Sequence, residues 1–219
     1  MGNNSLFLHL LLALLLGHVK PDPDPLQDYC VADNKPKGSF FTNGKPCIDP
    51  NLASPSHFCT SVLSKPGNTK GNVFGFNVTL TNTVNLPGLN TLGLTLARVD
   101  LSENGIVPPH SHPRASEVTI CLKGSILVGF VDTSNRLFSQ KLLPGDSFVF
   151  PKALIHFLYN PDLNSPALAL SGLSSQNPGL QLVALASFTS KPSIPDQILA
   201  KAFQITGQDV SRIRKNLGG

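Results

Sequence analysis

Three histidines and a glutamate in the middle of the chain have the residue types and the spacing of a transition-metal site. His110 and His112 lie two residues apart, so in a strand both imidazoles point to the same face and can reach one ion. Glu117 lies five residues after His112, an odd offset that would put it on the opposite face of a continuous strand. A bend after the histidines would let Glu117 reach the same face from the next strand. His156 lies in a second apolar segment and becomes the fourth ligand when the two segments approach in the fold.

The alternative interpretation is a set of surface histidines, or of core histidines that donate to backbone carbonyls. The chain has six histidines, and His9 and His18 fall in a segment that we expect to be removed. Three of the other four belong to the group above, and His57 lies outside it. This concentration in one stretch favours the metal site.

The segments around this site have the character of short strands. Low charge, many Gly and Pro, and many Val, Leu, Thr and Phe predict an all-β domain. From residue 73 onward, apolar runs separated by turn residues predict a sandwich or a barrel closed on itself. Helical spacing follows at 195–203 and 207–216. The expected strands are residues 75–80, 93–101, 115–122, 125–131, 137–143, 146–150, 156–160, 167–173 and 180–186.

Two stretches of the chain resemble the two sequence motifs of the cupin superfamily, residues 105–124 the first and residues 145–160 the second. The sequence of residues 108–117, Pro-Pro-His-Ser-His-Pro-Arg-Ala-Ser-Glu, is more specific than the general cupin motif and resembles plant germins and germin-like proteins. There are departures at two turn positions, where Asn104 and Ala153 replace glycines of the motifs. Further agreement lies at residues 25–33, 90–93 and 175–179 and at the Pro-rich entry to the C-terminal tail.

The resemblance implies a cupin jelly-roll β-barrel with an N-terminal arm and a short C-terminal helical tail. Imidazole and carboxylate ligands by themselves suit manganese, iron, nickel and zinc, whereas the resemblance implies manganese. Three His and one Glu leave two positions open in an octahedral site, as a catalytic metal needs. In germins the C-terminal tail clasps a neighbouring subunit, which implies trimers paired into hexamers. The alternative is that the tail folds back on its own subunit.

The N-terminus has the features of a secretory signal peptide. Residues 6–16 form an apolar run that is too short to span a bilayer, and a Pro-rich segment follows it. We therefore expect a signal peptide at about 1–20, an arm at 21–70, the barrel at 71–190 and the tail at 191–219. No later segment of the sequence is suited to anchor the chain in a membrane, so we expect a secreted protein of the extracellular space, the apoplast and cell wall. Export also fits the sequon at Asn77, a glycosylation site.

The four cysteines are interpreted in the light of export. Cys30 and Cys47 flank a loop, and an oxidising compartment would let them pair. The germin resemblance implies this disulfide. Cys121 shares the parity of Glu117 in its strand, so we expect a buried free thiol inside the barrel, and the state of Cys59 stays open.

The charge of the chain excludes one class of partner and leaves another open. The formal net charge is +4, and the basic residues are scattered singly apart from one short cluster near the C-terminus. This pattern gives no support to nucleic-acid binding. A basic surface is compatible with an acidic cell-wall polysaccharide such as pectin, with an ordinary solvated surface as the alternative.

Three functions compete for such a protein. Oxalate oxidation requires groups that hold a small dianion, and oxalate-oxidising germins present Asn at two positions that align here with Ala97 and Val107. Neither side chain offers an amide donor, so oxalate oxidase activity is disfavoured. Superoxide dismutation needs a redox-capable ion, an open site and a proton source, which makes it the better enzymatic hypothesis. The third is a non-enzymatic wall or receptor-like protein with a structural metal, a role assigned to germin-like members in defence and development.

Overall fold

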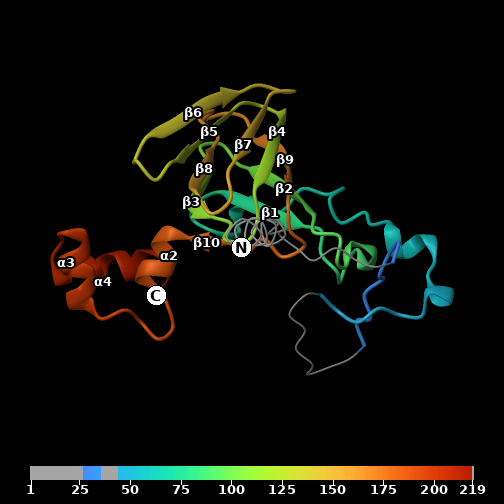
Figure 1. Ribbon diagram of the computed structural model, residues 1–219. Helices are drawn as coiled ribbons and strands as arrows, with labels where there is room; N and C mark the ends of the chain where they lie inside the picture. The colour runs from blue at the N-terminus through green and yellow to red at the C-terminus, as the bar shows by residue number, and fades with distance from the viewer. Residues whose placement is uncertain (1–26, 36–43, 219) are drawn as a thin grey trace, which may run out of the picture.

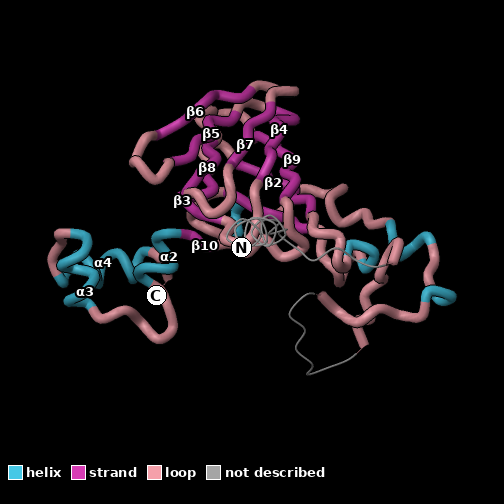
Figure 2. Tube along the Cα trace, in the orientation of Figure 1, coloured by secondary structure: helices cyan, strands magenta, loops and turns pink. Residues whose placement is uncertain are grey.

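The computed structural model describes residues 27–35 and 44–218. The expected signal peptide at 1–20 lies outside the described residues, as do residues 21–26 and 36–43 of the expected arm. Figure 1 shows a β-structure at the centre, the N-terminal arm on one side of it and three helices on the other. Figure 2 shows the same division, with the strands confined to the centre.

Two five-stranded antiparallel sheets form the β-structure. In the first sheet the order is β1-β2-β9-β4-β7, and in the second it is β10-β3-β8-β5-β6. Most strands that are neighbours in a sheet are therefore distant in sequence, and the chain crosses repeatedly between the sheets. The bounds are β1 Phe76–Leu80, β2 Thr95–Leu101, β3 Ile106–Ser111, β4 Glu117–Lys123, β5 Ile126–Val131, β6 Leu137–Leu142, β7 Ser147–Phe150, β8 Ile155–Tyr159, β9 Ala167–Leu173 and β10 Gln181–Leu182. The expected all-β fold is confirmed.

The core lies between the sheets and follows the two-residue period of the strands. In β9 every second side chain from Ala167 to Leu173 is buried, and the intervening ones are partly exposed. Cys121 is a free thiol that is fully buried in the core, as predicted from its sharing the inward-facing parity of Glu117. The largest core members are Leu101, Ile126, Leu142, Phe150 and Leu158.

Tight turns precede the two strands that carry histidines at the centre of the molecule. Asn104, two residues before β3, has φ of 56°, and Ala153, two residues before β8, has φ of 65°. Both are left-handed conformations that favour glycine, which is the residue that the motifs usually place there. Asn tolerates this region, whereas Ala costs of order 1 kcal/mol. The substitutions therefore keep the turn geometry.

The described part of the arm is fastened to the first sheet's loops. Cys30 and Cys47 form a disulfide, and the Ala32 amide donates to the Pro87 carbonyl at 3.0 Å. The buried Asn90 side chain donates to the Lys45 carbonyl at 2.7 Å. Short 3-10 helices punctuate this region and the loop after β1: η1 Pro50–Leu52, η2 Pro55–Phe58, η3 Thr69–Gly71 and η4 Pro87–Leu89. Cys59 is free and exposed.

The C-terminal helices pack on one another instead of on the barrel core. Helices α2 (Val183–Phe188), α3 (Asp196–Phe203) and α4 (Gly207–Asn216) share a small core around Phe188, Leu199 and Val210. We call these three helices the helical unit. Of the three, α2 contacts β3 and β10 of the barrel. Among the described residues, no helix combines the length and the apolarity that a membrane crossing requires.

The expected strand at 180–186 is wrong beyond its first residues. Strand pairing ends at Leu182, and the chain continues as α2. The sequence from 183 is Val-Ala-Leu-Ala-Ser-Phe, in which Ala and Leu are good helix formers. The helix brings Phe188 into contact with Leu199 and Val210. This packing between residues distant in sequence cannot be predicted from strand periodicity.

Candidate metal centre

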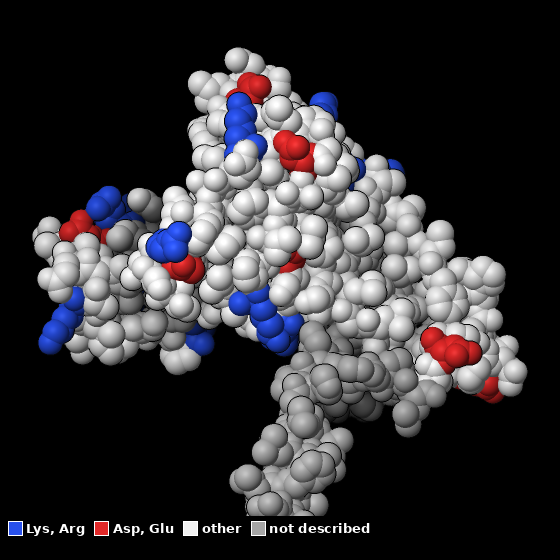
Figure 3. All heavy atoms as spheres, turned by 45° about the horizontal axis from the view of Figure 1, so that its top comes forward, with Lys and Arg blue, Asp and Glu red and all other residues white. Residues whose placement is uncertain are grey.

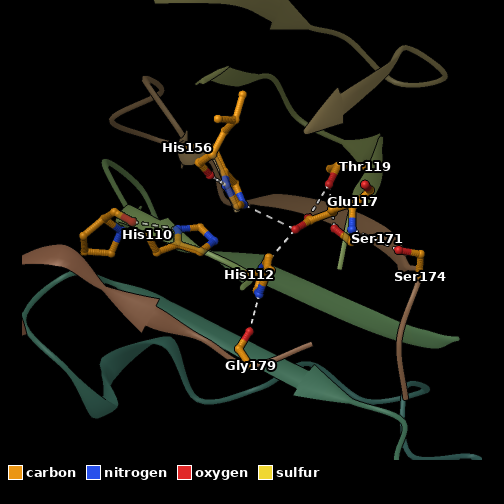
Figure 4. A network of polar contacts seen from close by, with 11 residues as sticks. His110, His112, Glu117, Thr119, His156, Ser171, Ser174 and Gly179 are labelled. Carbon is orange, nitrogen blue, oxygen red and sulfur yellow. Dashed lines mark hydrogen bonds and ion pairs between the residues drawn. The ribbon is translucent and has the colours of Figure 1, made fainter. Parts of the chain in front are cut away.

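Four side chains from β3, β4, β8 and the residue after β3 point toward one another (Figure 4). His110 lies in β3, His112 directly follows that strand, Glu117 opens β4 and His156 lies in β8. Their potential ligand atoms all lie within 4.8 Å of one another. His110 and His156 are register partners across β3 and β8, which brings their Cβ atoms close on one face. The four residues singled out in the sequence therefore form one group.

Each of the three imidazoles is held by a backbone carbonyl. The Nδ1 atom of His110 lies 2.8 Å from the Pro108 carbonyl, and that of His156 lies 2.9 Å from the Leu154 carbonyl. The Nδ1 atom of His112 contacts the Gly179 carbonyl (Figure 4). A carbonyl accepts only, so each Nδ1 carries the proton and donates. In the neutral ring the Nε2 atom then keeps its lone pair, as a metal ligand requires.

Glu117 is held by a chain of hydroxyls. Its Oε1 atom accepts a hydrogen bond of 2.7 Å from the Thr119 hydroxyl, which lies 2.7 Å from the Ser171 hydroxyl. The other oxygen, Oε2, lies 3.0 Å from His112 Nε2 and 3.4 Å from His156 Nε2. One oxygen is thus used for orientation, and the other points at the histidines (Figure 4).

The electrostatics of the group favour an anionic Glu117 and a neutral His110. Burial opposes ionisation of Glu117, but contacts with His112 and His156 outweigh it and hold the pKa of the carboxyl well below its ordinary value. Burial, together with the charge of His156, lowers the pKa of His110 to about 3. For His112 burial acts downward, yet its contacts with Glu117 and the Gly179 carbonyl raise its pKa above the ordinary value.

The donor set fits a divalent ion. Glu117 Oε2 and His156 Nε2 are buried and have no hydrogen-bond partner within the described part of the chain, although such atoms normally have one. An ion bound between the four residues would satisfy both atoms. Three imidazole nitrogens and one carboxylate oxygen suit the first-row transition metals. The group is therefore a His3Glu metal-binding site, and the identity of its metal is a separate question.

A pocket of about 230 Å³ leads from this group towards the solvent. His110, His112 and Glu117 lie in its wall, together with Ala97 and Val107, the two positions expected from the germin resemblance to belong to the substrate pocket. Nine of its fourteen lining residues are apolar: Val78, Leu80, Ala97, Val99, Val107, Leu158, Leu173, Pro178 and Leu180.

The segment before β10 lines the mouth of this pocket. Asn177 is part of the lining, and its Oδ1 and backbone carbonyl accept hydrogen bonds from the Arg114 guanidinium at 2.9 and 2.6 Å. The Arg114 amide donates to the Pro178 carbonyl at 3.1 Å. These bonds fix the segment that presents the Gly179 carbonyl to His112. Asn177 thus places a side-chain amide at the mouth, a feature that the sequence analysis did not include.

Three residues that orient the metal-binding side chains were not predicted from the sequence. Thr119 and Ser171 orient Glu117, and Gly179 orients His112, but none of them is a ligand type for this metal class. A signal for Thr119 existed, because it shares the inward parity of Glu117 and Cys121 in β4. Nothing local in the sequence pairs Gly179 with His112, which lie 67 residues apart.

Asn77, the expected glycosylation site, lies in β1 and is half-buried. Its Oδ1 accepts a hydrogen bond of 3.2 Å from the hydroxyl of Thr79, the other polar member of the sequon. Its side chain also packs against the backbone at Gly67, where an added Cβ would clash with it. Glycosylation of Asn77 stays a prediction.

Charged side chains are sparse on the face of the molecule shown in Figure 3. Lys and Arg lie apart from one another over the barrel and the helical unit, and most of that surface is uncharged. The basic side chains are thus dispersed on this face, as the basic residues are dispersed along the sequence.

Comparisons with known proteins agree with the fold and the site. The family model described as "Cupin" matches residues 61–211. The chain is 63% identical over 213 residues to "Germin-like protein subfamily 1 member 1" of Arabidopsis thaliana, covering 96% of this chain and 97% of the relative. It is 55% identical over 214 residues to "Germin-like protein 3-1" of Oryza sativa subsp. japonica, covering 96% and 95%.

A solved structure titled "Structural and spectroscopic insights into the mechanism of oxalate oxidase" has a TM-score of 0.85 and 39% identity, covering 90% of this chain and 99% of that one. Fold, disulfide, ligand group and sequence identity along nearly the whole length thus agree. The chain belongs to the germin-like proteins of the cupin superfamily.

Proposed function

We propose that this protein is a secreted manganese protein that dismutates superoxide and has little oxalate oxidase activity. The observation that carries the proposal is the buried His3Glu group, whose unpartnered Glu117 oxygen and His156 nitrogen lie next to a pocket that opens to solvent. A metal with a purely structural role is usually closed off by its ligands, whereas a reactive metal keeps an open position.

The chain's own residues give the site a charge that suits this reaction. Two superoxide anions and two protons become one dioxygen and one hydrogen peroxide, so no further oxidant or reductant is required. A manganese ion held in the site supplies the one-electron acceptor and donor. His110 stays neutral because of its lowered pKa, and Glu117 stays anionic. The ligands plus a divalent ion then sum to one positive charge, which attracts a small anion entering from solvent.

Oxalate is a poorer candidate because Ala97 and Val107, which lie in the pocket wall, have no hydrogen-bonding groups. Each absent donor lowers the affinity for a substrate that needs it by roughly 1–3 kcal/mol. The amide of Asn177 at the mouth is already bonded to Arg114 through its oxygen. Oxalate therefore lacks partners in the interior part of the pocket.

Export and self-association complete the proposal. The disulfide between Cys30 and Cys47 is typical of an oxidising compartment, and glycosylation at Asn77 would accompany it. We place the protein in the apoplast or cell wall, with a role in defence and with wall polysaccharide as a contact. The helical unit exposes Ile198 and Phe203, and we propose that it contacts neighbouring subunits in trimers that pair into hexamers.

Metal analysis combined with superoxide and oxalate turnover tests the proposal on one preparation of purified protein. We expect one manganese per chain, superoxide turnover, and little oxalate-dependent peroxide. The double variant Ala97→Asn, Val107→Asn should bind oxalate more tightly with unchanged metal content. Robust oxalate oxidation by the unmodified protein would contradict our interpretation of the two positions. Full metal occupancy with neither activity would instead leave the structural role.

A further inference from the structure

The pocket beside the metal group is much larger than a diatomic anion requires. Its volume of about 230 Å³ compares with roughly 30 Å³ for one water molecule in the liquid, so it has room for a small organic molecule. It is smaller than the roughly 300–1,000 Å³ typical of drug-sized ligands. The occupant that fits is therefore a compact molecule of several heavy atoms.

The walls of the pocket select a hydrocarbon body. Val107 and Leu158 are almost fully buried on the side of β3 and β8. On the other side Val78, Leu80 and Ala97 come from β1 and β2. Apart from the metal-binding residues, Asn177 at the mouth is the one polar side chain that residues 27–35 and 44–218 contribute to the lining. A ligand with several hydroxyl or amide groups would lose hydrogen bonds with water and gain few partners inside.

The charge at the metal-binding end of the pocket favours a ligand with a single negative head group. Three neutral imidazoles, one carboxylate and a divalent ion carry one net positive charge. No Lys or Arg belongs to the lining among the described residues, although Arg114 reaches Asn177 at the mouth. One carboxylate neutralises this end, whereas a dianion leaves an unpaired negative charge within an apolar pocket, which is costly.

We propose that the metal-loaded pocket binds a small aliphatic monocarboxylate, with its carboxylate at the metal end and its branched hydrocarbon body against Leu80, Ala97, Val107 and Leu158. This inference rests on the metal site of the proposed function, and it adds a ligand class that superoxide turnover does not require.

Calorimetric titration of the manganese-loaded protein with isovalerate, acetate, oxalate and isovaleramide tests the inference. Each buried methylene strengthens binding about fourfold, so the three extra carbons of isovalerate should lower its Kd at least about tenfold relative to acetate. Oxalate should bind more weakly than isovalerate. Isovaleramide, which has the same body without the charge, should show no measurable binding, and so should isovalerate with metal-free protein.

Proton NMR relaxation of bound isovalerate gives the orientation. Manganese broadens nearby protons most strongly, so the methylene next to the carboxylate should be broadened more than the methyl groups. The reverse order, with the methyl groups closer to the metal, would overturn the proposed orientation.

Variants locate the hydrocarbon body. Ala97→Leu fills the pocket and should raise the Kd of isovalerate at least tenfold while the Kd of acetate and the metal content stay unchanged; Ala202→Leu, on the exposed surface of α3, is its matched control. If Ala97→Leu does not fold, Leu80→Asn at the half-exposed edge of the pocket replaces it, with Leu122→Asn outside the pocket as control.

The outcomes separate this inference from the proposed function. Equal binding of isovalerate and acetate by protein that contains manganese and turns over superoxide would overturn the inference and leave the proposed function intact. Protein without manganese would overturn the proposed function first. Undiminished isovalerate binding in both Ala97→Leu and Leu80→Asn would place the ligand elsewhere and refute the inference.

Discussion

The substitution Glu117→Gln isolates the charge of one ligand without changing the volume of the site. It removes the anionic oxygen that faces His112 and His156 and keeps an oxygen for the Thr119 hydroxyl. Because the ion binds the folded chain, free ion at 100 times its Kd stabilises the native protein by about 2.7 kcal/mol. For a domain of this size that corresponds to an increase in Tm of roughly 5–11 °C.

Thermal unfolding with and without manganese measures this increment for each protein against its own metal-free form. We expect the full increment for the unmodified protein and less than about 2 °C for Glu117→Gln. Glu103→Gln makes the same chemical change at an exposed position before β3 and should keep the full increment. If Glu117→Gln retained the whole metal-dependent increase in Tm, Glu117 would not be a ligand and the geometric argument would fail.

Further predictions concern the residues around the ligands and the helical unit. Thr119→Val removes the hydroxyl that orients Glu117 and should raise the Kd for the metal about 10- to 100-fold, which competition with a chelator measures; an unchanged Kd would contradict this role. The raised pKa of His112 means that its protonated form stabilises the metal-free fold below the unfolded pKa of about 6.5, and that this contribution is lost as pH rises through the folded pKa. Metal binding must displace that proton, so the Tm difference between loaded and metal-free protein should widen from about pH 6 to 8, and a constant difference would argue against it. Thr206→Ala removes the hydroxyl that caps α4 with Asp209 and should destabilise that helix by about 1 kcal/mol, seen as faster amide exchange at 207–216 with unchanged metal affinity.

Strand periodicity predicted the part of the site that lies in a regular strand. In β4, Glu117, Thr119 and Cys121 alternate with exposed or partly exposed residues, and all three are buried as their parity requires. The same rule fails in β3. Val107 and His110 lie three residues apart, so simple alternation would place them on opposite faces, yet both line the pocket.

The register of β3 against β8 explains this failure, because it shifts between Val107 and His110. An extra residue in one strand returns the next side chain to the same face. The intervening residues are two prolines, which cannot donate to the ladder, so the irregularity has a local cause. The family resemblance, and not the parity of Val107, implied that this residue belongs to the pocket.

The C-terminal region shows a different limit. The helical spacing of α3 and α4 was visible because each presents apolar residues on one face and has turn residues at its ends. The six residues of α2 are too few to show such a period, and their Val and Leu content also suits a strand. What decides the outcome is the contact of Phe188 with residues that lie later in the chain, which no local window contains.

One short stretch of chain, residues 179–182, connects the metal group, the mouth of the pocket and the helical unit. Gly179 offers its carbonyl to His112, Leu180 lines the pocket, and β10 pairs with β3 at Ser111 and His110 before α2 begins. A displacement of α2 would therefore act on the partner of His112 and on the pocket wall through covalently adjacent residues. If subunits contact one another through the helical unit, as proposed, their association restrains the same backbone that orients a metal ligand. A tail that holds subunits together and a site that holds an ion would then stabilise each other through a single element, β10.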